Sequence, residues 1–212
     1  MVRITEEELK KRAEHNYGRL FDLEEVSLHQ LNIKRIENLD KFCKNLKIIY
    51  LQDNAIQKLE NLNRLKTLEY LNISLNAIEY IEGLERCENL KKLDLTLNFV
   101  GEISSIFTLR ENEALEELYL TGNPCATYKH YREFVVTVLP RPRWLDGVLV
   151  EKSERIIARQ SFEMIKESVQ REEEEYKVRR QEVKLRVSYD DKAITTFNKY
   201  SSVLYEKRKR RN

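Results

Sequence analysis

The chain has 212 residues, of which 41% are hydrophobic and 35% are charged, and its formal net charge is +2. The hydrophobic fraction can fill a core, whereas the charged fraction exceeds the roughly 25% of an ordinary globular chain and must be solvated. The near-neutral balance excludes a chain that is basic throughout, as one binding nucleic acid or a membrane by charge alone would be.

The length suggests one domain with appendages, and the uneven distribution of charge along the chain indicates that its two parts face different surroundings. Residues 153–212 hold 16 Lys and Arg against 11 Asp and Glu, and the preceding residues hold 22 against 25. The first eight residues lack the apolar segment of a signal peptide, and no stretch approaches the roughly 20 apolar residues that span a bilayer. We therefore expect a soluble protein, with Cys43, Cys87 and Cys125 as buried thiols in a reducing, intracellular compartment.

Residues 1–20 are predicted to form a capping helix. Thr5, with Glu8 three residues later, matches the capping box that opens a helix, which we expect to continue to about residue 16. Its apolar residues would cover the first of the repeats that follow: Ile4, Leu9 and Ala13.

Residues 21–125 contain five copies of one sequence pattern. Four copies match LxxLxLxxN at residues 46–54, 68–76, 90–98 and 115–123, and an imperfect copy at 23–31 has Leu31 in place of the final Asn. The final Asn residues of the four good copies are 22, 22 and 25 positions apart. This pattern at this period is the leucine-rich repeat, so we predict an α/β solenoid of short, 22-residue repeats.

Each part of the pattern has a structural role. The LxL core forms a short strand, whose leucines point inward while their neighbours point outward. The Asn ends the strand, where its amide can bond backbone groups that the turn leaves unpaired. One repeat cannot bury its apolar face alone, so the array needs neighbours and a cap at each end. The residues with this structural role are Asn54, Asn76, Asn98 and Asn123.

The outward strand positions are the candidate binding surface, because they are expected to face the concave side of the solenoid. Tyr50, Tyr70 and Tyr119 are large amphipathic side chains at these positions, and tyrosine is enriched at binding hot spots. We therefore expect a protein partner to bind there. The predicted partner-binding residues are Tyr50, Gln52, Tyr70, Asn72, Lys92, Asp94, Glu117 and Tyr119.

Residues 126–150 are predicted to form an aromatic cap over the last repeat. This segment carries Tyr131, Phe134 and Trp144 together with several aliphatic residues. We assign Trp144 a structural role in this cap.

Residues 151–190 are predicted to form a charged helix, because Gly and Pro are absent and the helix-favouring residues Glu, Lys, Arg and Gln are abundant. Val169, Tyr176 and Val183 recur every seven residues, which is compatible with a coiled coil or with a solvated single helix. Residues 191–212 carry a second apolar pattern, expected as a short helix, and a basic tail. Such a tail is compatible with nuclear import, nucleic acid, an acidic partner or simple solvation.

No catalytic motif occurs in the chain. The phosphate-binding, nucleophile-elbow and HExxH zinc patterns are absent, and only three histidines are available for acid–base chemistry. Ser27 and His29 lie two positions apart on the first strand, but no base-orienting partner accompanies them. We therefore expect a non-enzymatic protein without cofactor or metal.

Several stretches outside the generic repeat resemble one family closely. They are residues 13–16 (AEHN), 93–106 (LDLTLNFVGEISSI), 122–125 (GNPC), 130–136 (HYREFVV), 139–140, 144–147 and 153–156. Over about residues 3–160 the chain resembles the tilB family of dynein axonemal assembly factors.

The resemblance implies a factor that acts in the cytoplasm of ciliated cells, with the cilium or flagellum as a further location, in the pre-assembly of outer and inner dynein arms. It implies axonemal dynein chains, chaperones and a MYND-type zinc-finger assembly factor as partners, and neither nucleic acid nor a membrane is expected. Family members usually continue into a CS-type β-domain, whereas no strand-rich segment follows the helix here. An axoneme-bound structural role is therefore one alternative.

Two further alternatives share features with the chain. A nuclear ribonucleoprotein subunit with leucine-rich repeats has a related cap, and a phosphatase-binding regulator has the same repeat length. Against the nuclear alternative, Lys92 is the only cation among the expected concave positions, where an RNA-binding surface would be basic.

Overall fold

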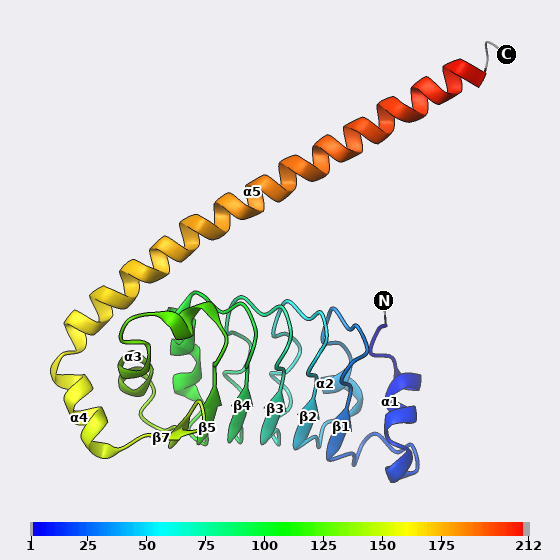
Figure 1. The fold of residues 1–212 in the computed structure, drawn as a ribbon. Helices are drawn as coiled ribbons and strands as arrows, with labels where there is room; N and C mark the ends of the chain where they lie inside the picture. Colours follow the sequence, from blue (N-terminus) through cyan, green and yellow to red (C-terminus); the bar gives the residue numbers. More distant parts are fainter. Residues whose placement is uncertain (1, 210–212) are drawn as a thin grey trace. The chain divides into compact units, whose positions relative to one another are not determined.

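The fold is a solenoid followed by a long helix. The computed structural model describes the backbone of residues 2–209 and the side chains of residues 2–186. The chain divides into two compact units, residues 1–173 and 174–212 (Figure 1). The first unit holds the sheet and both caps, and the second is the remainder of the last helix.

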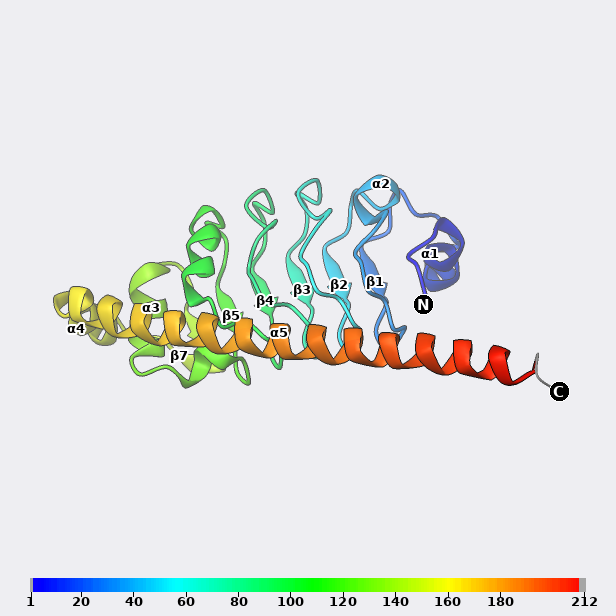
Figure 2. The same ribbon diagram turned by 90° about the horizontal axis from the view of Figure 1, so that it is seen from above.

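The sheet of the first unit has seven strands in sequence order, one after another along the solenoid. The first six strands pair in parallel and the last pair is antiparallel. The strands lie along one side of the unit and the return segments along the other (Figure 2). Their bounds are β1 Glu25–Ser27, β2 Ile48–Tyr50, β3 Tyr70–Asn72, β4 Lys92–Asp94, β5 Glu117–Tyr119, β6 Trp144–Leu145 and β7 Val148–Leu149.

The register of the sheet follows from the repeat. The central strand residues Ile49, Leu71 and Leu93 lie opposite one another in the ladder and are buried, while both neighbours of each are half-exposed. The return segments are mostly irregular, with the short helices α2 Leu39–Phe42, η2 Ile103–Glu111 and η3 Pro124–Thr127, of which η2 and η3 are 3₁₀ helices. The predicted α/β solenoid is confirmed.

Helix α1, Glu6–Arg12, closes the N-terminal end of the core. The Thr5 hydroxyl accepts a hydrogen bond of 3.2 Å from the amide of Glu8, which satisfies one of the unpaired donors of the first turn. Ile4, Leu9 and Ala13 are buried, as a cap over the first repeat requires. A single turn of 3₁₀ helix, η1 Glu14–Asn16, follows.

Helix α3, Tyr131–Val138, closes the other end and buries Phe134 and Val135. Trp144, for which we predicted a structural role in this cap, lies on β6 and outside the buried core. Its neighbour Leu145 is buried at the end of the core, and strand alternation therefore turns Trp144 to the outward side, where 40% of its surface is exposed. Trp144 continues the outward row of the sheet, opposite Glu117.

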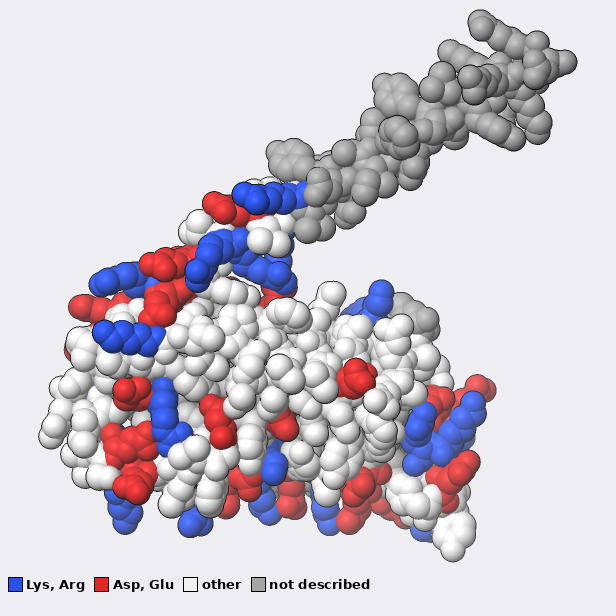
Figure 3. All heavy atoms as spheres, in the orientation of Figure 1, with Lys and Arg blue, Asp and Glu red and all other residues white. Residues whose placement is uncertain are grey.

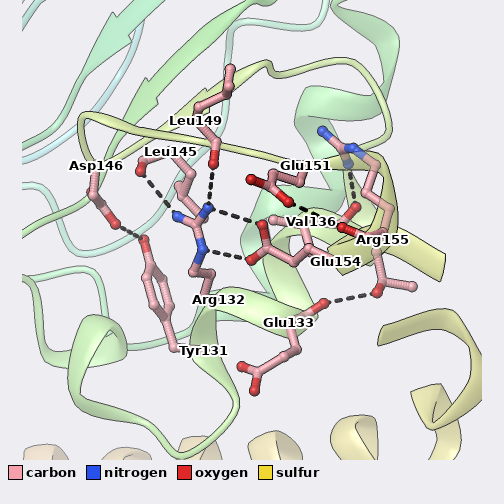
Figure 4. A network of polar contacts seen from close by, with 12 residues as sticks. Tyr131, Arg132, Glu133, Val136, Leu145, Asp146, Leu149, Glu151, Glu154 and Arg155 are labelled. Atoms are coloured by element: carbon pink, nitrogen blue, oxygen red, sulfur yellow. Dashed lines mark hydrogen bonds and ion pairs between the residues drawn. The ribbon is translucent and has the colours of Figure 1, made fainter. Parts of the chain in front are cut away.

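A polar network joins this cap to helix α4, Lys152–Gln160 (Figure 4). The Arg155 guanidinium donates to the carbonyl oxygens of Val136, Leu139 and Pro142, so it satisfies acceptors at and beyond the end of α3. Burial lowers the pKa of Arg155. Arg132 on α3 forms an ion pair with Glu154 on α4, with Nε and Oε1 2.6 Å apart.

Helix α5, Phe162–Lys209, differs from the predicted boundaries. We expected one charged helix over 151–190 and a separate short helix after it. Instead the chain breaks near Ser161, between α4 and α5, and continues as one helix through residue 209. The backbone of residues 210–212 and the side chains of the apolar pattern and basic tail lie outside the described residues.

The first turns of α5 pack within the first unit. Phe162 stacks on Phe134 with ring centroids 6.1 Å apart, and Ile165 and Val169 are buried. The carboxylate of Glu173 accepts hydrogen bonds from the amide and the hydroxyl of Ser104, at 2.9 and 2.8 Å. Val169, one residue of the seven-residue spacing, is therefore part of the solenoid core.

The final Asn of each repeat ties its own turn to the preceding repeat. Asn76 accepts a hydrogen bond from the amide of Ile56 at 3.0 Å and donates to the carbonyl oxygens of Leu51 and Ile73 at 2.9 and 3.1 Å. Asn98 and Asn123 make the same pattern of bonds one and two repeats further on, and all three are buried. Asn54 is half-buried and bonds two amides of the first repeat.

We expect Asn76→Ala to lower the free energy of unfolding by roughly 1–3 kcal/mol, because it leaves buried backbone groups unpaired. Urea denaturation of the full chain measures this. Asn72→Ala is the matched control, since Asn72 is half-exposed and its side-chain oxygen accepts bonds from the amide and hydroxyl of Ser74, two residues later. An equal decrease of the free energy of unfolding in the two variants would contradict the special role of the buried Asn.

Candidate partner-binding face

The outward side chains of β1–β6 form one continuous surface, which we call the strand face. Two rows follow from the strand register. The first row is Glu25, Ile48, Tyr70, Lys92, Glu117 and Trp144, and the second is Ser27, Tyr50, Asn72, Asp94 and Tyr119.

Five of the predicted partner-binding residues touch one another on the strand face. The Lys92 ammonium is 2.9 Å from Glu117 Oε2 and lies 5.2 and 5.1 Å from the ring centroids of Tyr70 and Tyr119. Tyr50 meets Tyr70 edge to face, with centroids 5.7 Å apart. The Tyr119 hydroxyl donates to Glu117 Oε2 at 3.1 Å. We call these five residues the Lys92 cluster.

The ionisation states of the Lys92 cluster are coupled. The hydrogen bond with Lys92 lowers the pKa of Glu117, and the same bond raises the pKa of Lys92. Partial burial raises the pKa values of Tyr70 and Tyr119. At neutral pH the cluster therefore holds one ammonium and one carboxylate among neutral rings. Its cation–π and aromatic contacts keep the rings in fixed positions, which lowers the entropy cost of using them in binding.

Two of the other three predicted residues bond groups of the turn that follows their strand, and the third has an unpaired side-chain oxygen. Asn72 Oδ1 accepts from the amide and hydroxyl of Ser74 at 3.1 and 2.8 Å, and Asp94 Oδ1 accepts from the amide of Thr96 at 2.9 Å. Gln52 has its side-chain oxygen buried without a hydrogen-bond partner. Asn72 and Asp94 thus shape the strand ends while lying beside the Lys92 cluster.

Sequence reasoning missed Trp144 as part of the strand face. The signal was present, because Leu145 completes the inward row and its neighbour must then point outward. Treating every aromatic residue of the cap as core hid that alternation. With Trp144, the first row carries aromatic side chains at both β3 and β6.

Ser27 and His29 come together on the face, but the residues that the structure describes do not complete a catalytic constellation there. Ser27 Oγ and His29 Nδ1 are 2.7 Å apart, and this exposed pair has no third residue hydrogen-bonded to the imidazole. Over the described part of the chain, no group of three or more His, Cys, Asp or Glu could hold a metal ion, and no helix is long and apolar enough to cross a membrane. The cysteines are free and buried, and burial raises the pKa of Cys43 to about 11.

Comparison with known proteins finds a matching family model and close relatives along most of the chain. Residues 1–174 match the family model described as leucine-rich repeat. Dynein axonemal assembly factor 11 of Xenopus tropicalis is 58% identical over 176 residues, which cover 83% of this chain and 37% of that protein. Protein tilB of Drosophila melanogaster is 49% identical over 194 residues, which cover 92% and 49%. The chain therefore spans less than half the length of these relatives.

A solved structure with the same architecture is a chain of the Drosophila melanogaster SNF/U2A′ complex. It is 31% identical, superposes with a TM-score of 0.65, and the match covers 76% of this chain and 93% of that one.

Glu117→Gln tests the charge pair of the Lys92 cluster. Because the folded pKa of Glu117 is lowered, its ionised form stabilises the fold above the unfolded pKa of about 4.3, and this contribution is lost as pH falls through the folded pKa. Both side chains are about one-third exposed, so we expect the variant to be less stable by only roughly 0.2–1 kcal/mol at neutral pH.

Urea denaturation at neutral pH and again below about pH 3 measures this difference, which should vanish in acid. A difference that persisted unchanged in acid would mean that the amide disturbs packing instead of charge.

Proposed function

Since this chain belongs to the tilB-type leucine-rich-repeat family, we propose that it is a non-catalytic protein-binding scaffold for the cytoplasmic pre-assembly of axonemal dynein arms. Identity of 58% to a protein named dynein axonemal assembly factor 11, and of 49% to protein tilB, supports the proposal. Its proposed partners are axonemal dynein chains, chaperones and a MYND-type zinc-finger assembly factor. Its proposed location is the cytoplasm of cells with cilia or flagella, with the organelle itself as a further site.

The Lys92 cluster is the observation that supports binding through the strand face. Rigid, half-exposed tyrosines with polar tips contribute large contact areas at low entropy cost. Lys92 is held between two of these rings and paired with Glu117, so the one cation of the Lys92 cluster is balanced by a carboxylate. A face of this kind suits a folded protein surface better than a polyanion.

Two alternatives remain distinct from this proposal. An axoneme-bound structural role would use the same strand face on an assembled organelle. The SNF/U2A′ likeness favours a role in a nuclear ribonucleoprotein as the second candidate, although its 31% identity is well below that of the assembly factors. RNA contact across the strand face is disfavoured, because RNA binding needs a basic surface. Among the outward positions of β1–β6, Lys92 is the single Lys or Arg, and it is already paired with Glu117.

We expect Tyr50→Ala with Tyr119→Ala to weaken capture of axonemal dynein chains by the full chain about tenfold or more, with little change in thermal stability, because both rings are outward and half-exposed. Affinity capture from ciliated cells with quantitative mass spectrometry measures this. Tyr17→Ala with Phe21→Ala is the matched control, because these aromatic side chains are exposed near the N-terminal cap, away from the strand face.

Dynein chains and chaperones captured by the parent and the control, and lost from the test variant, would support both the role and the face. Equal capture by all three would move the binding site off the strand face. Capture of splicing proteins in their place would overturn the dynein proposal and favour the nuclear alternative.

A further inference from the structure

The strand face carries more negative than positive charge. Its two rows hold three carboxylates, Glu25, Asp94 and Glu117, and a single ammonium, that of Lys92. Lys92 pairs with Glu117 at 2.9 Å, whereas neither Glu25 nor Asp94 forms an ion pair with a residue that the structure describes. Two carboxylates of this face are therefore available to a cation of another molecule.

The charges beside the strand face are already paired with one another. At the edge where the strands begin, Lys47 pairs with Glu24 and Lys91 pairs with Glu69, both at 2.7 Å. Figure 3 shows side chains of both signs gathered along the lower edge of the solenoid, with a few acidic side chains above it that stand among uncharged ones. The solenoid thus supplies cations to the carboxylates of this edge and not to Asp94.

Asp94 is fixed in position before any partner binds. It is the last residue of β4, and its Oδ1 accepts a hydrogen bond of 2.9 Å from the amide of Thr96. Its other oxygen, Oδ2, accepts no hydrogen bond from the described part of the chain. Because one oxygen already holds the side chain, little conformational freedom is lost when the other accepts a bond from a partner.

Two tyrosine rings flank the Asp94 carboxylate. Tyr119 is the register neighbour of Asp94 on β5, and Tyr70 lies in the adjacent row on β3. Burial is the main cause of the raised pKa of each phenol, and the charge of Asp94 raises both pKa values further because the carboxylate lies near both rings. Asp94 is itself half-buried, so solvent screens an ion pair here less than on an open surface.

We propose that Asp94, Tyr70 and Tyr119 form a binding site for an arginine side chain of a protein partner. A guanidinium is planar, so its N–H groups can bond a carboxylate while its face lies against an aromatic ring. Lys92 does not repel this cation, because Glu117 balances its charge. The inference deepens the proposed scaffold function and rests on it, but it does not require the partner to be a dynein chain.

Lysine fits this site less well than arginine. An ammonium is a compact, strongly hydrated charge without a flat face. The chain's own Lys92 ammonium already lies over both rings, at 5.2 Å from the centroid of Tyr70 and 5.1 Å from that of Tyr119. A second cation must therefore use the carboxylate as its main contact, and two parallel N–H donors suit a carboxylate better than a single point charge.

Selection from a library of random displayed peptides on the immobilised full chain tests this site. We expect arginine to be enriched in the peptides that bind, relative to the unselected library. Fluorescence anisotropy then gives the Kd of the tightest peptide and of versions with lysine or citrulline in place of the arginine. Citrulline keeps the shape and loses the charge, so we expect it to weaken binding about tenfold or more, and lysine about threefold or more.

Asp94→Asn is the decisive variant, because asparagine keeps an oxygen for the amide of Thr96 and loses only the charge. We expect it to melt as the parent does and to bind the arginine peptide about tenfold or more weakly, while the citrulline peptide binds both proteins equally. Glu25→Gln is the matched control, since it also removes an unpaired carboxylate of the strand face. Glu25 is exposed and its register neighbour is Ile48, so this variant should bind as the parent does.

Four outcomes would overturn the proposal. They are selected peptides without arginine enrichment, equal binding of the arginine and lysine peptides, equal binding by Asp94→Asn and the parent, and an equal loss in Glu25→Gln, which would assign binding to overall charge. If the proposal fails in one of these ways while Tyr50→Ala with Tyr119→Ala still lowers dynein capture, the scaffold function stands. If arginine binding depends on Asp94 but dynein chains are not captured, the site stands and the dynein role fails.

Discussion

The structure depends on a buried amide that serves two repeats at once. Asn76 bonds the end of its own strand through Ile73 and the preceding turn through Ile56 and Leu51, and Asn98 repeats this one step later. A short strand with its turn would otherwise bury unpaired carbonyl and amide groups. Because each amide needs the repeat before it, the turns are satisfied only in a stack, and stability is shared between neighbours.

The same stacking explains why the outward residues can act as a surface. Parallel pairing brings residues 22 or 25 positions apart in the chain into lateral contact, so Tyr70, Lys92 and Glu117 become neighbours without any local sequence signal. The inward side chains must be apolar because they fill the core, whereas the residue types of the outward rows can differ from repeat to repeat. The Lys92 cluster lies on these outward rows, so the binding role proposed for it does not compete with the buried leucines for places in the core.

Sequence predicted the parts that repeat and missed those that occur once. The inward leucines and final asparagines can be identified from the sequence because they recur at a nearly constant spacing. The break near Ser161 depends on how a single cap packs, which composition does not encode, whereas the outward position of Trp144 follows from its alternation with Leu145 and was overlooked. Asn72 and Asp94 lie in the outward row, and sequence alone did not indicate that their short side chains also bond the turn that follows each strand.

The last strand pair bears on how such an array can grow. β6 and β7 run antiparallel, and Arg132 donates a hydrogen bond of 3.1 Å to the carbonyl oxygen of Leu149 on that final strand. A further parallel repeat therefore has no matching ladder to join, and the occupied carbonyl hinders pairing with another molecule. Duplication of a repeat can therefore lengthen this solenoid between its two caps, where the final Asn of each repeat bonds backbone groups of the repeat before it. New repeats would then be internal copies, and the two capping segments would stay unchanged.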